Sequence, residues 1–177
     1  MAQDNFRGVR RVLDLGGGIG GYAMAFSRAL EDLAVTVVDI PEVAEIGRQG
    51  IAGTGLQDRI EFLGGDYHEV ALGSGYDLVL LANVLHIDKP DKAEALVRRA
   101  ADTLNPGGRV CVVDFAIDDQ KRSNVMGALF AINMRNFGDT HSEPEIRGWM
   151  QAAGIGSIQR FDLPPAHWLI AGQLTST

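Results

Sequence analysis

The sequence predicts an α/β fold, a seven-stranded and mostly parallel sheet that ends in an antiparallel pair of strands. Three observations lead to this prediction. Short apolar, β-branched segments alternate with segments of helical periodicity through the first two thirds of the chain. The first apolar segment runs directly into a glycine cluster, which is typical of a tight strand-to-helix turn. The last two apolar segments are joined by Pro164-Pro165-Ala166, a link too short for a parallel crossover.

Strands and helices alternate regularly in the first part of the chain. Pro41 opens the second helix, at a position where its missing N–H costs nothing. The segment Asn105-Pro106-Gly107-Gly108 stops the helix that begins near Pro90 and precedes the fifth strand. Such alternation favours parallel strands with right-handed crossovers. The expected strands are residues 10–15, 34–39, 59–63, 76–82 and 109–115.

The last third of the chain departs from this alternation. Residues 125–137 form a predicted helix rich in Met and Phe, and Ser142 with Glu145 forms a capping box that starts the next helix. Two strands follow, at residues 155–163 and 167–174. Because their link is short, we expect these two strands to pair antiparallel.

Size and charge exclude several classes of protein. The 177 residues fit one domain, residues 1–177, and the formal net charge of −7 argues against nucleic acid or an anionic membrane surface as the main partner. No apolar run approaches a membrane span, and no signal peptide is recognisable. Cys111 is the only cysteine, so the chain has no intrachain disulfide and no thiolate cluster for zinc. We therefore expect a cytoplasmic protein.

The glycine-rich turn is the first chemical signal. Glycines allow the backbone to approach a nucleotide, and the following helix offers free N–H groups. Any tight turn favours glycine, so the prediction of a nucleotide site depends on two neighbouring carboxylates. Asp14 precedes the glycines, and Asp39 ends the second strand, where it can accept both hydroxyls of a ribose. A nicotinamide dehydrogenase would share Asp39, but not Asp14 or the antiparallel strand pair.

Four segments together resemble a known family. They are Val-Leu-Asp-Leu-Gly-Gly-Gly-Ile-Gly at residues 12–20, Val-Asp-Ile-Pro at 38–41, Gly-Gly-Asp-Tyr at 64–67 and Val-Leu-His-Ile-Asp at 84–88. They are similar to the class I S-adenosylmethionine-dependent methyltransferases, and more narrowly to the catalytic domain of O-methyltransferases of the caffeate, hydroxyindole and bacterial polyketide-tailoring type. The resemblance implies a Rossmann-like methyltransferase fold and extends from about Arg10 to Gln173.

The resemblance implies S-adenosylmethionine as the cofactor. Asp39 would hold the ribose hydroxyls, while Asp66 and Tyr67 would contact the adenine by a hydrogen bond and by packing. Tyr67 also fits the plainer interpretation of a half-buried loop aromatic. The glycines would pass under the methionine part. The full set assigned to the cofactor is Asp14, Gly16, Gly18, Gly20, Asp39, Ile40, Asp66, Tyr67 and Asn83.

His86 is the candidate for chemistry. It lies just past the carboxyl end of the fourth strand, at the sheet edge where open α/β folds bind ligands. An imidazole can take a proton from a hydroxyl near neutral pH. Asp114 ends the adjacent fifth strand and can hold one tautomer of the ring. A satisfied turn histidine beside a strand-end aspartate is the structural alternative.

The chain departs from the family pattern near this base. Ile87 and Asp88 stand where plant members have Asp-Trp, and Ala82 stands where they have a lysine. The family pattern has a second carboxylate beside the base. The residue nearest to that position here is Asp139, which is offset by one place. His68, His141 and His167 have no ligand spacing, so we expect no metal site.

The helix at residues 125–137 carries apolar side chains on more than one face. We expect Met126, Phe130 and Met134 to contact a flat substrate, although plain packing explains any one of them. The family has a dimerising helical domain before this fold, whereas the first strand here begins by Arg10, so the chain is either a stand-alone core or a fragment. Together these features predict a homodimer.

The sequence thus predicts an enzyme that methylates a hydroxyl of a small aromatic metabolite. The alternative from another class is a non-catalytic cofactor-binding module, a truncated or degenerate core that serves as a partner subunit. A dehydrogenase is the third interpretation.

Overall fold

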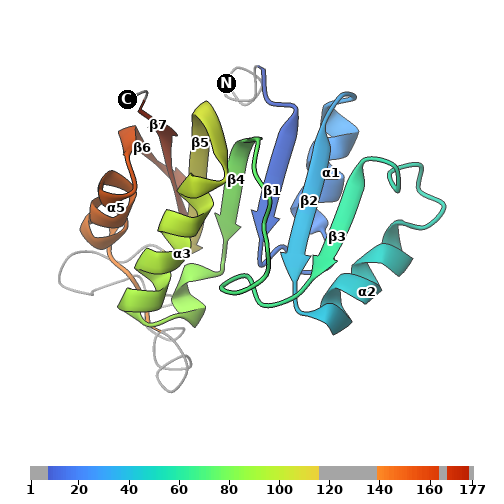
Figure 1. Ribbon diagram of the computed structural model, residues 1–177, viewed down its shortest axis with the longest axis horizontal. Helices are drawn as coiled ribbons and strands as arrows, with labels where there is room; N and C mark the ends of the chain where they lie inside the picture. Colours follow the sequence, from blue (N-terminus) through green and yellow to red (C-terminus); the bar gives the residue numbers. More distant parts are fainter. Residues whose placement is uncertain (1–7, 116–138, 164–166, 176–177) are drawn as a thin grey trace.

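The computed structural model describes residues 8–115, 139–163 and 167–175 of the 177-residue chain. Within these residues, seven strands form one sheet in the order β3-β2-β1-β4-β5-β7-β6 (Figure 1). The predicted helix at residues 125–137 lies outside the described residues. No helix in the described ranges has the length and apolar character needed to cross a membrane.

The strands agree closely with the sequence prediction. They are β1 (Arg11–Leu15), β2 (Ala34–Asp39), β3 (Ile60–Gly64), β4 (Tyr76–Ala82), β5 (Leu104–Phe115), β6 (Ile155–Leu163) and β7 (His167–Leu174). The helices are α1 (Gly21–Ala29), α2 (Pro41–Ile51), α3 (Pro90–Asp102) and α5 (Glu143–Ala152), with a short 3-10 turn η2 (Leu85–Ile87). The neighbours among β1 to β5 pair parallel, and β7 pairs antiparallel with both β5 and β6. The mostly parallel sheet with an antiparallel C-terminal strand is confirmed.

The predicted start of the fifth strand was wrong. β5 begins at Leu104 and contains the Asn-Pro-Gly-Gly segment that we expected to lie outside it. The pairing register with β4 shifts there, because Tyr76 faces Leu104 while Leu78 faces Arg109. Gly107 has a positive φ of 76°. The turn residues therefore form an irregularity within the strand.

Helices cover both faces of the sheet, and each face has its own core. α3 buries Ala93, Leu96, Val97 and Ala100, a spacing that places one apolar stripe against the sheet. Ile146 and Met150 of α5 join this core. On the other face α1 and α2 pack against the sheet through Ala23, Ala44 and Ile51. α5 begins with the predicted capping box, in which the Ser142 amide donates to Glu145 Oε2 over 2.7 Å.

Parallel pairing brings the carboxyl ends of β1 to β5 to one edge of the sheet, the lower edge in Figure 1. The loops that follow these strands meet at this edge. All the described candidate residues come from these loops or from the strand ends beside them. Open α/β sheets bind their ligands at this edge.

Candidate active site

The glycine turn after β1 leaves open space above it. Gly16, Gly18 and Gly20 have φ values of +68°, +60° and +86°, in the left-handed region that disfavours other residues. A Cβ at Gly20 would lie 2.7 Å from the ring of Phe62, so packing requires that glycine. A Cβ at Gly18 would meet no atom of the described part of the chain within 4 Å. The turn therefore has room for a ligand at Gly18.

Asp39 connects this turn to the end of β2. Its Oδ2 accepts a hydrogen bond from the Gly18 amide at 2.8 Å, and its Oδ1 accepts one from the Ile40 amide at 2.9 Å. Each carboxylate oxygen retains capacity for a further donor. The Ile40 side chain is 53% exposed and offers an apolar surface beside the carboxylate.

Asp14 lies under the turn and is buried. Within the described part of the chain, neither of its carboxyl oxygens has a hydrogen-bond partner. A Cβ at Gly17 would lie 2.6 Å from this carboxyl group, so only glycine fits above it. Burial, and secondly the negative charge of Asp39, raise the pKa of Asp14 to about 7. A carboxyl group with a pKa near neutrality therefore lies beneath the turn.

The loop after β3 reaches the same turn. Tyr67 is half-buried, and its Cε1 is 3.9 Å from the position of a Cβ at Gly16. Burial, followed by the charges of Asp88, Asp66 and Asp39, holds the pKa of the Tyr67 hydroxyl above its usual range. The Arg99 side chain of α3 donates to the Tyr67 carbonyl at 3.2 Å. The ring is therefore half-buried, as the plainer interpretation states, and it also faces the turn.

His86 and Asp114 form a buried pair at the ends of β4 and β5. The ring Nδ1 lies 2.7 Å from Asp114 Oδ1, and both residues are 5% exposed. The His86 amide also donates to Asp114 Oδ2 at 3.3 Å. A carboxylate only accepts hydrogen bonds, so Nδ1 carries the proton and Nε2 is the basic nitrogen of the neutral ring.

The other predicted site residues lie around this pair. The amide of Asp139 donates to the His86 carbonyl at 3.2 Å, while its Oδ1 accepts from the Thr140 amide. Asn83 follows β4 with a φ of 55°, and its Oδ1 is 3.1 Å from His167 Nε2. A catalytic role of Asp139 and a cofactor role of Asn83 stay predictions. The predicted substrate contacts Met126, Phe130 and Met134 lie outside the described residues.

Two further histidines, to which the sequence patterns assign no role, contact the segment that carries His86. His68 Nε2 lies 2.8 Å from Asp88 Oδ2. His141 Nε2 lies 3.0 Å from the Leu85 carbonyl and 3.2 Å from the Asp88 carbonyl. The sequence contained a signal for the contact between His68 and Asp88. His68 follows β3 and Asp88 follows β4, and both strands end at the same edge of the sheet.

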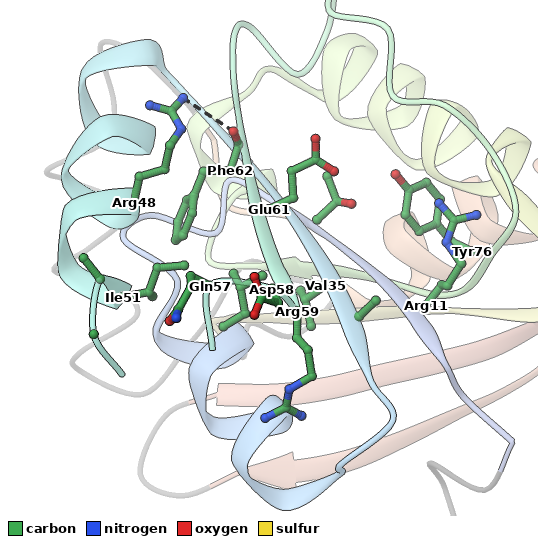
Figure 2. A pocket seen from close by; sticks show the side chains of 15 residues that line it. Arg11, Val35, Arg48, Ile51, Gln57, Asp58, Arg59, Glu61, Phe62 and Tyr76 are labelled. Carbon is green, nitrogen blue, oxygen red and sulfur yellow. Dashed lines mark hydrogen bonds between the residues drawn. The ribbon is translucent and has the colours of Figure 1, made fainter. Parts of the chain in front are cut away.

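A cavity of about 770 Å³ lies at the opposite edge of the sheet. Its lining includes Arg11, Ala34, Ile60 and Tyr76, which are the first residues of β1, β2, β3 and β4. Its lining arginines make structural contacts. Figure 2 shows Arg48 turned toward the Phe62 carbonyl, to which it donates at 3.4 Å.

The other arginines of this cavity are engaged as well. Arg11 lies over the ring of Tyr76, 4.9 Å from its centroid. Arg59 Nη1 donates to three carbonyls at the end of α1, those of Ser27, Leu30 and Glu31. We therefore place the candidate site at the carboxyl edge.

Comparisons with known proteins identify the family of the chain. A family model described as an O-methyltransferase domain matches residues 1–156. The chain is 33% identical over 175 residues to 3-hydroxy-5-methyl-1-naphthoate 3-O-methyltransferase of Streptomyces sahachiroi, which covers 97% of this chain and 51% of the relative. It is 31% identical over 151 residues to the mitomycin biosynthesis 6-O-methyltransferase of Streptomyces lavendulae, covering 85% and 43%.

Solved structures show the same fold. The apo form of the S-adenosylmethionine-dependent methyltransferase SibL matches with a TM-score of 0.86 and 33% identity, over 99% of this chain and 53% of that one. Human N-acetylserotonin methyltransferase in complex with SAM matches with a TM-score of 0.86 and 26% identity, over 97% and 49%. The chain thus spans about half the length of these relatives. It belongs to the O-methyltransferase domain family of S-adenosylmethionine-dependent methyltransferases.

Proposed function

We propose that this chain transfers a methyl group from S-adenosylmethionine to a hydroxyl of a small aromatic metabolite, with His86 as the general base. The observation that carries the proposal is the buried contact of 2.7 Å between His86 Nδ1 and Asp114 Oδ1. This pair lies at the same sheet edge as the open glycine turn.

The residues present fit this cofactor. The open space at Gly18 admits a ligand against the backbone, and the carboxyl of Asp14 beneath the turn, which has no hydrogen-bond partner among the described residues, favours a positively charged group above it. Asp39 would accept the ribose hydroxyls with its remaining lone pairs. Ile40 and Tyr67 would enclose the adenine from two sides, and Asp66 would accept a hydrogen bond from its amino group.

His86 acts on the acceptor. Its Nε2 takes the proton of the acceptor hydroxyl, which makes the oxygen a stronger nucleophile. Asp114 fixes the tautomer in which Nε2 carries no proton, and its negative charge stabilises the imidazolium that results. The cofactor supplies an electrophilic methyl group, so the protein needs to contribute placement and this one proton transfer.

The relatives support an aromatic acceptor. Their names refer to methylation of a hydroxynaphthoate in one case and to mitomycin biosynthesis in another. The chain covers about half of these proteins, so the activity and substrate class are proposals here. The same comparisons favour an enzyme over the alternative of a non-catalytic binding module.

Methyl transfer from radiolabelled S-adenosylmethionine to a panel of hydroxynaphthoates, including 3-hydroxy-5-methyl-1-naphthoate, tests the proposal. We expect labelled product with at least one phenol and none with the matching methyl ethers, which lack the proton that His86 removes. Binding of S-adenosylhomocysteine without transfer to any phenol would favour the non-catalytic module.

We propose in addition that the chain forms a homodimer in the cytoplasm. The helix that led to the dimer prediction lies outside the described residues. Support from the described ones comes from Tyr22 and Phe161, each 41% exposed, which line an apolar groove of about 450 Å³ over β4, β5, β6 and β7. Sedimentation velocity of the wild type and of Phe161→Glu tests the dimer, and we expect the substitution to shift the dimer toward monomer.

The proposed location in the cytoplasm is supported by the lone cysteine, Cys111, which fits a reducing compartment.

A further inference from the structure

His68 and Asp88 join two loops that come from strands far apart in the sheet. His68 follows β3, and Asp88 follows β4 and η2. The strand order places β2 and β1 between β3 and β4, so three strand spacings of about 4.8 Å separate them, or about 14 Å. The contact of 2.8 Å between His68 Nε2 and Asp88 Oδ2 closes this distance. The loops that carry His68 and Asp88 therefore together span the carboxyl ends of β2 and β1, where Asp39 and the glycine turn lie.

Figure 1 shows the path of the chain between these strands: it leaves β3, runs along the lower edge of the sheet and then rises to β4. Its other attachment is to α3, through Arg99, which donates to the carbonyls of Tyr67 and Val70. The Arg99 contacts hold the loop from one side. His68 holds it to the segment that carries His86.

The contact is built into both loops. The His68 amide donates to Asp66 Oδ1 at 2.8 Å, and the His68 ring lies 4.8 Å from the Tyr67 ring, so one residue contacts both predicted adenine-binding side chains. Asp88 is 8% exposed, and its amide donates to the Leu85 carbonyl across η2. A carboxylate so buried requires a partner, since leaving it unpaired is costly. Among the side chains that the structure describes, His68 is the one that hydrogen-bonds to it.

We propose that His68 is a positioning residue that couples the adenine loop to the turn carrying His86, by way of Asp88. The inference deepens the proposed function and rests on it. With the link in place, Asp66 and Tyr67 on one side and His86 on the other are held in one arrangement before the cofactor binds. Without this contact the two loops sample other arrangements. Ordering them on binding then reduces the affinity for the cofactor.

The test compares His68→Phe with His68→Gln. Phenylalanine keeps a ring beside Tyr67 but cannot donate to Asp88, whereas the glutamine amide can still donate. Arg98→Ala is the matched control, because it removes an ion pair between two exposed side chains of α3, Arg98 and Glu94. Two readouts are taken on the purified chain: the Kd for S-adenosylhomocysteine by calorimetry, and the ring ¹⁵N signals of His86, assigned by their absence in His86→Ala.

We expect His68→Phe to raise the Kd about tenfold, which corresponds to a link worth about 1.4 kcal/mol in preorganisation. We also expect it to broaden or split the His86 signals of the free protein. His68→Gln and Arg98→Ala keep the wild-type Kd and a single His86 signal. A wild-type Kd together with unchanged His86 signals in His68→Phe would overturn the proposal, as would equal effects of His68→Phe and His68→Gln.

Two provisions keep the outcome decisive. If His68→Phe does not fold, Asp88→Ala carries the same test, because it removes the buried carboxylate and leaves a histidine that is 20% exposed to water. If the wild-type chain does not bind S-adenosylhomocysteine, the proposed function fails. The His86 signals of the free variants then still decide whether the link orders the turn.

Discussion

The amide of Gly18 donates a hydrogen bond to Oδ2 of Asp39 over 2.8 Å, across 21 positions of sequence. This bond joins the turn after β1 to the end of β2, its parallel neighbour in the sheet. A ligand that binds to the free lone pairs of Asp39 therefore also lies against the turn. The candidate site thus combines the backbone of the glycine turn with the Asp39 carboxylate, joined by a hydrogen bond. Each of these parts can be tested by a separate substitution.

Asp39→Ala should weaken binding of S-adenosylhomocysteine at least tenfold. The carboxylate is expected to accept two ribose hydroxyls, and each such charge-assisted bond is worth about 1.5–3 kcal/mol. Calorimetric titration measures the effect, with Glu42→Ala on the exposed start of α2 as the control. Equal affinities of the two variants would remove Asp39 from the cofactor site.

Gly18→Ala should separate ligand binding from folding. The added Cβ meets no atom of the described residues within 4 Å, so the expected cost to stability is the left-handed backbone strain, about 1–2 kcal/mol. Gly53→Ala is a close control, because Gly53 has a φ of +75° and equally open surroundings away from the site. Thermal melts should show similar losses for both, while only Gly18→Ala weakens S-adenosylhomocysteine binding. Wild-type affinity in Gly18→Ala would mean that no ligand lies on this turn.

Asp14→Asn should change how stability depends on pH. Because burial raises the pKa of this carboxyl from 3.8 to about 7, the native state keeps a proton that the unfolded chain has released between these pH values. The free energy of unfolding contributed by Asp14 thus falls as pH rises from about 4 to about 7, by about 4 kcal/mol, and is level above that. Urea unfolding at several pH values should show the wild type losing stability relative to the variant across this window. Parallel curves for the two proteins would show that Asp14 does not titrate there.

Much of the fold follows from local sequence. β2, β4, β6 and β7 have the predicted bounds, because their apolar runs end at charged or turn residues. β5 was misplaced at its start, since Asn105 is held inside the sheet by its bond to Asp77, a contact between distant residues. The Asn-Pro-Gly-Gly segment predicted a turn before the strand, but it did not predict that β5 begins before this turn, at Leu104.

The candidate site was predictable where one strand end determines it, and less so where two loops meet. The edge shared by His86 and Asp114 followed from the expected adjacency of their strands, and the pair is in contact. The link between His68 and Asp88 depends on how a loop crosses two intervening strands, which no local pattern specifies. For Asp139 the structure shows a backbone contact with His86, while its side-chain role stays a prediction.

The most direct test of the central claim is the turnover of His86→Ala with a phenol that the wild-type chain methylates, measured beside the Kd for S-adenosylhomocysteine. Because the base acts on the acceptor and the cofactor is held by other residues, we predict a loss of about 10²–10⁴ in kcat with the Kd nearly unchanged. A variant that turns over at the wild-type rate would contradict this account and would mean that placement alone drives the transfer.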